Sequence, residues 1–240
     1  MGRLFQNGRA WDSTGRDWIE ADVLVGDDGI IESVQAGLSP REGIEITDCE
    51  GCLLVPGMFD LHVHGREPGE EHKETLARCS EAALHGGVTG LVLMPDTTPP
   101  IDSGNLVKSL KDLVSESSSV KMLPSGCLSK GRKGEQLAGF LGMANQGIVM
   151  LTDSGSSIAC PDLLRRCMEY AKDFDLLVTT FCDTAALSKA GAVNEGKVSY
   201  RLGLAGMPAM SRSSQSIGTS ALRNTLGLDC IFSRFLRQTR

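Results

Sequence analysis

Residues 58–95, MFDLHVHGREPGEEHKETLARCSEAALHGGVTGLVLMP, decide the fold predicted for this chain. The stretch begins with a strand pattern, MFDLHVHG, and ends with a continuous apolar run, VTGLVLMP, with an amphipathic helix pattern between them. Gly86 and Gly87 close the helix, because glycine favours the backbone conformation that follows a last helical turn. A strand, a helix and a second apolar strand in this order predict a βαβ unit with parallel strands.

The same alternation continues along the chain. Further strands are predicted at 119–128, 148–155 and 176–183, and further helices at 103–117, 134–147 and 160–175. Ser103 is suited to cap the helix that follows it, and Pro161 to occupy a first helical turn. Near-continuous apolar strands that alternate with helices predict a parallel sheet covered by helices. A doubly wound sheet and a (β/α)8 barrel both fit this pattern.

Residues 1–55 show a different pattern, in which short strand-like segments are separated by turns. Asn7-Gly8 is a hairpin-turn signal, and Asp27-Asp28-Gly29 separates two further β-rich runs. The segment is too small for a complete sandwich, so it predicts the N-terminal part of a small β-domain.

Residues 210–240 break both patterns. This tail holds five arginines, no lysine and one acidic residue, whereas residues 1–209 carry a net charge of −10. The change in composition predicts an atypical tail that is not homologous to the rest, as a shifted reading frame or a truncated gene would produce.

Bulk composition excludes several classes of function. The net charge of −6 argues against a nucleic-acid partner, which would favour a basic face. No apolar run is long enough to cross a membrane, and the N-terminus has no apolar export signal, so a cytoplasmic location is predicted. Cys49 and Cys52 form a C-x-x-C, for which we predict a structural or incidental role; the other six cysteines are predicted to be small buried apolar residues.

Polar side chains follow the predicted strands, where a parallel sheet places its chemistry. They are His62, His64, Arg66, Asp96, Asp153 and Asp183. His62 and His64 are two residues apart, so on a strand both side chains lie on one face and could hold a divalent ion such as zinc. The alternative is a pair of hydrogen-bonded histidines without a metal. Arg66 could hold a carboxylate with its planar guanidinium, or could be an ordinary surface arginine.

Several motifs in order resemble the dihydroorotases of the amidohydrolase superfamily. They are VPGMFDLHVHGREPG followed by HKE, then AALHGGVTGLVLMPDTTPPI, LTDSG and NEGKVSYRLGL. The resemblance runs from the N-terminal strands to about Pro208. It implies an α/β fold, an incomplete TIM-type (β/α)8 barrel over residues 56–209, preceded by part of a small β-sandwich domain.

The resemblance also implies an activity. A dihydroorotase is a zinc-dependent hydrolase that interconverts dihydroorotate and N-carbamoyl-aspartate in pyrimidine biosynthesis. His62 and His64 would hold one zinc ion, and Asp153 would bridge it to a second. His64, Arg66 and Asp96 would contact the substrate, with Arg66 on its carboxylate.

Departures from the family pattern predict an impaired enzyme. Phe181 stands where the family carries a ligand histidine, and Asp96 stands where it usually carries asparagine. Asp183 has the strand parity to substitute for the lost ligand. A further ligand histidine and the catalytic aspartate of the family have no counterpart here, so at most one well-formed zinc site is expected.

Two other functions stay open. One is an inactive dihydroorotase-like protein that serves as a structural partner of aspartate carbamoyltransferase. The other is a related cyclic amidase that acts on allantoin-like or hydantoin-like rings, for which Arg66 would be superfluous. Predicted partners are therefore a small-molecule substrate, a second copy of the chain or the carbamoyltransferase, with no nucleic acid and no membrane.

Overall fold

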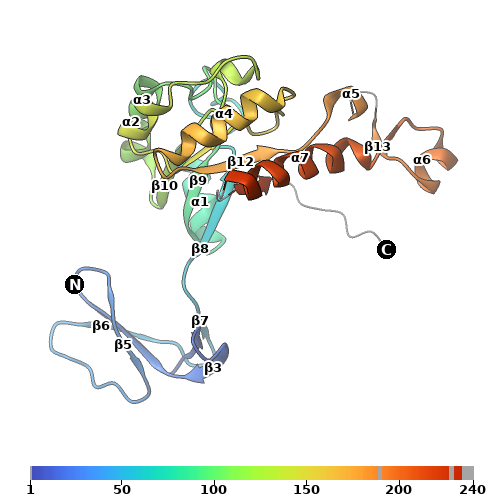
Figure 1. The fold of residues 1–240 in the computed structure, drawn as a ribbon. Helices are drawn as coiled ribbons and strands as arrows, with labels where there is room; N and C mark the ends of the chain where they lie inside the picture. The colour runs from blue at the N-terminus through green and yellow to red at the C-terminus, as the bar shows by residue number, and fades with distance from the viewer. Residues whose placement is uncertain (1, 189–190, 227–229, 234–240) are drawn as a thin grey trace. The chain divides into compact units, whose positions relative to one another are not determined.

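The computed structural model describes residues 2–188, 191–226 and 230–233 (Figure 1). Contacts between residues divide the chain into two compact units, Met1–Gly57 and Met58–Arg240. The boundary lies two residues beyond the one at 55 that the sequence predicts.

The smaller unit contains two small sheets. One has the strand order β5-β4-β1-β6 and the other the order β3-β2-β7. The strands are β1 (Arg3–Gln6), β2 (Arg9–Asp12), β3 (Asp17–Glu20), β4 (Asp22–Val25), β5 (Ile31–Gln35), β6 (Glu45–Asp48) and β7 (Leu53–Leu54). Most neighbours are antiparallel, but β1 pairs in parallel with β6 and β2 in parallel with β7. The chain therefore crosses between the two sheets more than once.

The two predicted turns of this unit behave differently. Asp27-Asp28-Gly29 joins the antiparallel strands β4 and β5, as expected. The prediction of a hairpin at Asn7-Gly8 is wrong, because β1 and β2 belong to different sheets. Asn7 does adopt a left-handed φ of 63°, and a Cβ on Gly8 would lie 2.7 Å from Leu54 Cδ1. Gly8 therefore packs closely on Leu54 of β7 at the point where the chain passes from one sheet to the other.

The larger unit is built on a six-stranded sheet, within the described residues, with the order β15-β12-β11-β10-β9-β8. Its strands are β8 (Met58–Val63), β9 (Val88–Leu93), β10 (Lys121–Gly126), β11 (Met150–Thr152), β12 (Leu177–Phe181) and β15 (Cys230–Ser233). Every neighbouring pair is parallel. From β8 to β12 each strand pairs with the next one in sequence, without the reversal of order that defines a doubly wound sheet. The sheet therefore corresponds to a curled part of a barrel.

Helices connect the strands at the predicted places. They are α1 (Leu76–His85), α2 (Gly104–Ser117), α3 (Phe140–Asn145) and α4 (Pro161–Lys172). The Thr75 hydroxyl accepts a hydrogen bond from Arg78 N at 3.4 Å and caps α1, and Pro161 is in the first turn of α4. Helix α3 is shorter than the predicted 134–147. The residues before it form the 3-10 turn η1 (Lys130–Arg132) and a bridge between Ser129 and Leu137.

Alternation along the strands separates two apolar clusters. In β9, Leu91 and Leu93 belong to the main core between sheet and helices. Val92 and Met94 point to the opposite face, where they form a small cluster with Met150. The helix-covered face therefore supplies most of the buried apolar surface of this unit.

Helices α2 and α3 approach each other closely at two glycines. A Cβ on Gly104 would lie 2.6 Å from the carbonyl oxygen of Gly142, whereas a Cβ on Gly142 would meet Gly104 N at 3.5 Å. The first turn of α2 thus packs directly on the backbone of α3.

The segment 184–226 extends the unit beyond the βα series. It contains α5 (Ala185–Ser188), β13 (Val193–Asn194), α6 (Lys197–Leu202), β14 (Gly206–Met207) and α7 (Met210–Leu226). Helix α7 packs on α4 and α5, and β15 adds to the sheet beside β12. The described part of the predicted 210–240 tail is thus packed into the larger unit; its non-homologous origin stays a prediction, and residues 234–240 lie outside the described residues.

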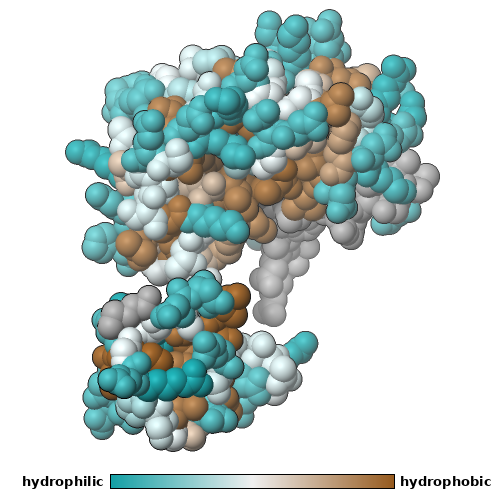
Figure 2. Space-filling view, turned by 90° about the vertical axis from the view of Figure 1, so that its left-hand side faces the viewer, coloured by the Kyte–Doolittle hydropathy of each residue, from teal (hydrophilic) through white to brown (hydrophobic). Residues whose placement is uncertain are grey.

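Apolar side chains also remain on the surface of the larger unit, as the brown areas of Figure 2 show. On β8, Met58, Phe59 and Leu61 are each about half exposed. Among the helices that the structure describes, none is both long and apolar enough to span a lipid bilayer.

Candidate functional site

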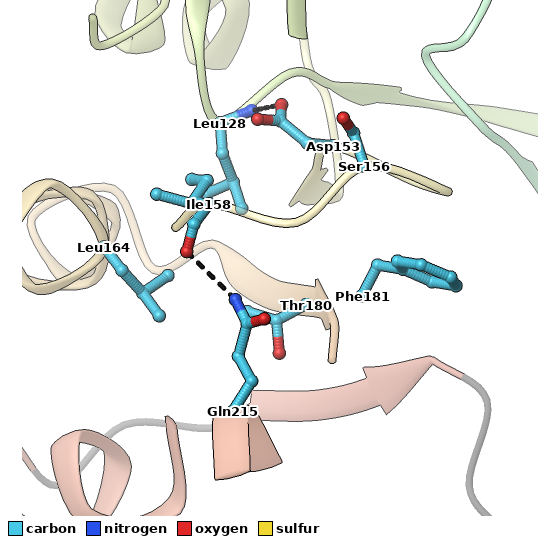
Figure 3. A pocket seen from close by; sticks show the side chains of 8 residues that line it. All are labelled: Leu128, Asp153, Ser156, Ile158, Leu164, Thr180, Phe181 and Gln215. Carbon is cyan, nitrogen blue, oxygen red and sulfur yellow. Dashed lines mark hydrogen bonds between the residues drawn. The ribbon is translucent and has the colours of Figure 1, made fainter. Parts of the chain in front are cut away.

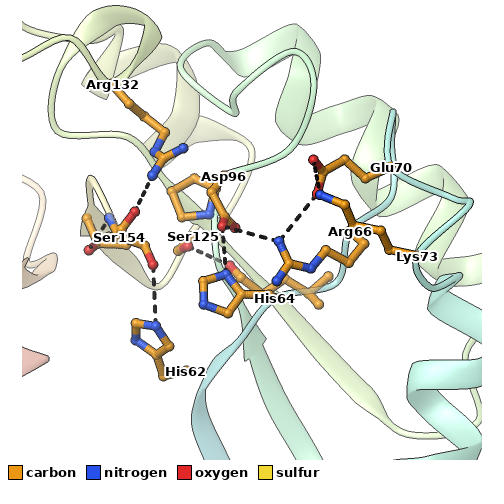
Figure 4. Close-up of polar contacts among 12 residues, drawn as sticks. His62, His64, Arg66, Glu70, Lys73, Asp96, Ser125, Arg132 and Ser154 are labelled. Atoms are coloured by element: carbon orange, nitrogen blue, oxygen red, sulfur yellow. Dashed lines mark hydrogen bonds and ion pairs between the residues drawn. The ribbon is translucent and has the colours of Figure 1, made fainter. Parts of the chain in front are cut away.

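The histidine pair lies at the carboxyl end of β8. Val63 packs against the helix-covered core, so the alternation of the strand places His62 and His64 on the other face. The two imidazole rings lie edge to face with their centroids 5.2 Å apart. The predicted juxtaposition of the two rings at the end of the first barrel strand is present (Figure 4).

His64, Asp96 and Arg66 form one polar network. His64 Nδ1 lies 2.7 Å from Asp96 Oδ2, and Arg66 Nη1 lies 3.9 Å from the same oxygen. Arg66 also donates to Glu70 Oε2 at 3.3 Å, and Glu70 accepts from Lys73 Nζ at 2.6 Å. The structure thus brings together all three residues predicted to contact a substrate, and it places a second carboxylate, that of Glu70, on Arg66.

Electrostatics favour the ionised form of Asp96. Burial alone would raise the pKa of Asp96, but the hydrogen bond with His64 and the nearby charges of His64, Arg132 and Arg66 outweigh it and lower the pKa. Asp96 is therefore an anion within contact range of the cationic group expected to bind a substrate carboxylate.

Two residues of the site were missed by the sequence analysis. Ser154 Oγ lies 3.3 Å from His62 Nε2, and the Arg132 guanidinium donates to the backbone oxygens of Asp153 and Ser154. Ser154 belongs to the LTDSG motif, which marks its position but not its contact with His62. Arg132 lies between Gly131 and Gly134 in a basic loop, and its own φ is 58°. Nothing in the sequence distinguishes it from a surface arginine.

Asp153 does not join the histidine pair. Its carboxylate is buried and accepts hydrogen bonds from Leu128 N at 2.9 Å, from Ser129 N at 3.0 Å and from the Ser129 hydroxyl. Burial raises the pKa of Asp153, although the hydrogen bonds from Ser129 and Leu128 oppose the shift. In this arrangement the carboxylate holds the loop after β10.

The chemistry of the site fits a divalent metal only in part. His64 Nδ1 bonded to a carboxylate is the arrangement that orients a metal-binding imidazole, with Nε2 left to act as the ligand. Zinc in proteins, however, takes three or four side-chain ligands. Across the described ranges, 2–188, 191–226 and 230–233, no three His, Cys, Asp or Glu side chains form a group that could hold a metal ion. The predicted ligand set of His62, His64 and Asp153 is not assembled in this structure.

Phe181 occupies the end of β12, where the sequence analysis places the missing ligand. Together with Asp153 it lines a small pocket (Figure 3). The pocket has a volume of about 10 Å³, which is on the order of one water molecule. Gln215 of α7 closes the pocket by donating to Ile158 O at 2.9 Å. Asp183, the suggested substitute ligand, accepts instead from the Ser188 hydroxyl at 2.8 Å. Neither position supplies a further ligand to the histidines.

Comparison with known proteins shows which family has this architecture. A family model described as dihydro-orotase-like matches residues 51–228, a range that includes the first part of the atypical tail. The chain is 39% identical to the dihydroorotase of Thermoanaerobacter sp. (strain X514) over 87% of this chain and 48% of that protein. It is 44% identical to the dihydroorotase of Desulfotalea psychrophila over 69% of this chain and 39% of that protein. The chain spans about half the length of the first curated relatives that it matches.

Solved structures support the same fold at low sequence identity. The L-hydantoinase (dihydropyrimidinase) from Arthrobacter aurescens superimposes with a TM-score of 0.77 and 21% identity, over 96% of this chain and 52% of that structure. The dihydropyrimidinase from Brevibacillus agri gives a TM-score of 0.71 with 18% identity. The expected fold class, an incomplete barrel of the amidohydrolase type with a small β-domain before it, is confirmed.

Proposed function

Because the chain belongs to the dihydroorotase-like family, we propose that it carries the first part of the active site of a cyclic amidohydrolase that acts on dihydroorotate. The reaction is the interconversion of dihydroorotate and N-carbamoyl-aspartate in pyrimidine synthesis. The observation that carries the proposal is the network of His64, Asp96 and Arg66 at the carboxyl end of β8.

In this proposal Arg66 orients the substrate through its carboxylate. The guanidinium is about one third exposed, and a planar fork of donors suits a carboxylate. Glu70 and Asp96 compete for the same guanidinium. Two anions beside the cation weaken the attraction for an anionic substrate, so we propose that the substrate binds weakly.

His62 and His64 are the proposed zinc ligands, and the zinc supplies an activated water when it is bound. Asp153 could join them only after leaving its three hydrogen-bond donors on Leu128 and Ser129. Because the described residues do not form a three-ligand group, we propose at most one weak site and little turnover.

A zinc titration combined with a dihydroorotate hydrolysis assay tests the proposal. We expect no more than one zinc ion per chain, with weaker binding in the His62→Ala and His64→Ala variants. His85→Ala is the matched control, because His85 is the last residue of α1 and has no place in the site. Equal zinc binding in all three variants would contradict the assignment. Turnover at the rate of a full-length dihydroorotase would contradict the proposed impairment.

A second candidate function is an inactive structural partner of aspartate carbamoyltransferase. The involvement of Asp153 in loop contacts and the presence of Phe181 at the end of β12 favour it. Co-purification of the chain with the carbamoyltransferase, unaffected by His62→Ala, would support this function. If the unaltered chain does not bind the carbamoyltransferase, this function is excluded.

A related cyclic amidase is the third candidate, since the first solved structures that the chain resembles are hydantoinases. The Arg66→Met variant distinguishes between these two substrate classes. Hydrolysis of dihydroorotate should fall in this variant, whereas hydrolysis of a hydantoin, which lacks the carboxylate, should be unchanged.

A further inference from the structure

The smaller unit contains a tight turn with a cysteine at each end. Within Cys49-Glu50-Gly51-Cys52, Cys52 N donates to Cys49 O at 2.8 Å, and Gly51 has a φ of 75°. A hydrogen bond from the fourth residue to the first, with glycine at positive φ in third place, defines a type II β-turn. The Cα atoms at the two ends of such a turn are less than about 7 Å apart. Disulfides join Cα atoms roughly 4.4–6.8 Å apart, so the turn holds the two cysteines at bridging distance.

Backbone hydrogen bonds fix both ends of this turn. Cys49 N donates to Gln6 O at 2.7 Å, and Cys52 O accepts from Arg9 N at 3.0 Å. The turn follows β6 of one sheet and precedes β7 of the other. The two cysteines are therefore held in place before any bond forms between them.

The two thiols differ in exposure. Cys52 is exposed, whereas Cys49 is 6% exposed and both are free thiols. Burial raises the pKa of Cys49, and the nearby charges of Cys52 and Asp48 raise it further. Cys52 is the thiol accessible to reagents, and Cys49 is the thiol placed to react second.

We propose that Cys49 and Cys52 form a reversible disulfide by exchange with a low-molecular-weight disulfide of the glutathione type. The Cys52 thiolate attacks one sulfur of the oxidised reagent, forms a mixed disulfide and releases one reagent thiolate. The Cys49 thiolate then attacks the Cys52 sulfur, forms the intramolecular bond and releases the second reagent thiolate. The two protons of the cysteine thiols pass to the two released thiolates, and the reagent is reduced by the two electrons that the cysteines lose.

The surroundings indicate a redox-modified site and not an oxidoreductase. Catalytic C-x-x-C motifs lie at helix termini or beside cations, which lower the pKa of the attacking thiol. Here the motif lies in a turn between strands, and Asp48 adds a negative charge next to it. The turn therefore fits a site of thiol–disulfide exchange whose bond is formed by a small disulfide and broken by small thiols.

Peptide mapping of the full chain tests this directly. Trypsin releases residues 42–66, which contain Cys49 and Cys52 and no other cysteine, and residues 134–165, which contain only Cys160. Cys160 is exposed like Cys52 and serves as the matched control. After treatment with oxidised glutathione, acid quenching and alkylation, peptide 42–66 should lack two hydrogens and carry no alkyl group. Peptide 134–165 should carry either an alkyl group or glutathione. Two alkyl groups, or glutathione without the internal bond, on peptide 42–66 would overturn the proposal.

Two variants test the order of the exchange. Cys49→Ser should trap glutathione on Cys52, because the second thiol is absent. Cys52→Ser should leave Cys49 largely unmodified, because Cys49 is buried. Equal glutathione incorporation in both variants would contradict the assigned roles. A test without substitution compares the folded chain with the chain unfolded in urea. In urea the turn no longer holds the two thiols together. The ratio of oxidised to reduced glutathione at which half of the pair is oxidised should therefore rise by about tenfold.

Discussion

The Asp153 carboxylate accepts three hydrogen bonds from buried donors. Leu128 N, Ser129 N and the Ser129 hydroxyl all depend on it. Removing an acceptor in such a position leaves buried donors unsatisfied, which costs more than the hydrogen bonds themselves contribute.

We expect Asp153→Ala to lower the free energy of unfolding by about 3 kcal/mol, because it leaves these donors unpaired. Asp153→Asn keeps the shape and one carbonyl oxygen, so its cost should stay below about 1 kcal/mol. Urea titrations of both variants measure the difference. Equal stability of the Ala and Asn variants would contradict a structural role for the carboxylate.

The raised pKa of Asp153, whose ordinary value is 3.8, also makes the stability of the chain depend on pH. Because the native state binds this proton more tightly than the unfolded chain, the free energy of unfolding falls as pH rises from 3.8 through the raised pKa. Asp153→Asn has no such proton and should become more stable relative to the native chain across that window. Urea titrations below and above the window check the sign, and an opposite trend would contradict the burial effect.

For single residues, the sequence predicts on which face of a strand a side chain lies better than it predicts which groups that side chain contacts. The spacing of His62 and His64 is enough to place both rings on one face, because side-chain alternation is a local property of a strand. The hydrogen bonds of Asp153 depend on where the loop at Leu128 and Ser129 folds, and no local pattern encodes that position. For the same reason the contact of Ser154 with His62 emerges only from the folded sheet.

Among the elements, the α2–α3 contact depends on one glycine. Gly104 faces the carbonyl of Gly142 at a distance that excludes a side chain, whereas Gly142 has ordinary space around it. A methyl group is therefore tolerated at one of these positions and not at the other.

Gly104→Ala should destabilise the chain by about 1–3 kcal/mol, because the new methyl group forces the two helices apart. Gly142→Ala is the control in the facing helix, and it should be neutral or stabilising by up to about 1 kcal/mol through reduced backbone entropy. Midpoints of urea unfolding compare the two variants. Similar midpoints would show that the helices separate without cost.

Element order is predicted well, and element ends less so. The βα alternation follows from apolar periodicity, and all the predicted strands and helices from 58 to 183 exist. Helix α3 is shorter because the residues before it pair with Ser129, and the chain at Asn7-Gly8 passes to another sheet, where Gly8 packs on Leu54. Both deviations arise from contacts distant in sequence, which periodicity does not report.

On the scale of the whole larger unit, β8 forms one margin of the described sheet. Its partner is β9, and Phe59 and Leu61 remain about half exposed on it. Parallel strands with exposed apolar side chains and an open backbone edge favour pairing with another chain.

We expect the chain to self-associate with increasing concentration, and Leu61→Lys to weaken this association by placing a charge on the edge strand. Leu141→Lys, on a similarly exposed position of α3, is the control and should have a smaller effect. Sedimentation velocity over a range of concentrations measures both. A monomer at all concentrations, or the same effect of both variants, would contradict the expectation.

The neighbour-by-neighbour order of β8, β9, β10, β11 and β12 has a consequence for biosynthesis. Each newly made strand finds its docking position on the strand completed just before it, so no segment has to wait for a distant one. The ribosome can therefore deliver this sheet one βα repeat at a time, and folding can keep pace with translation.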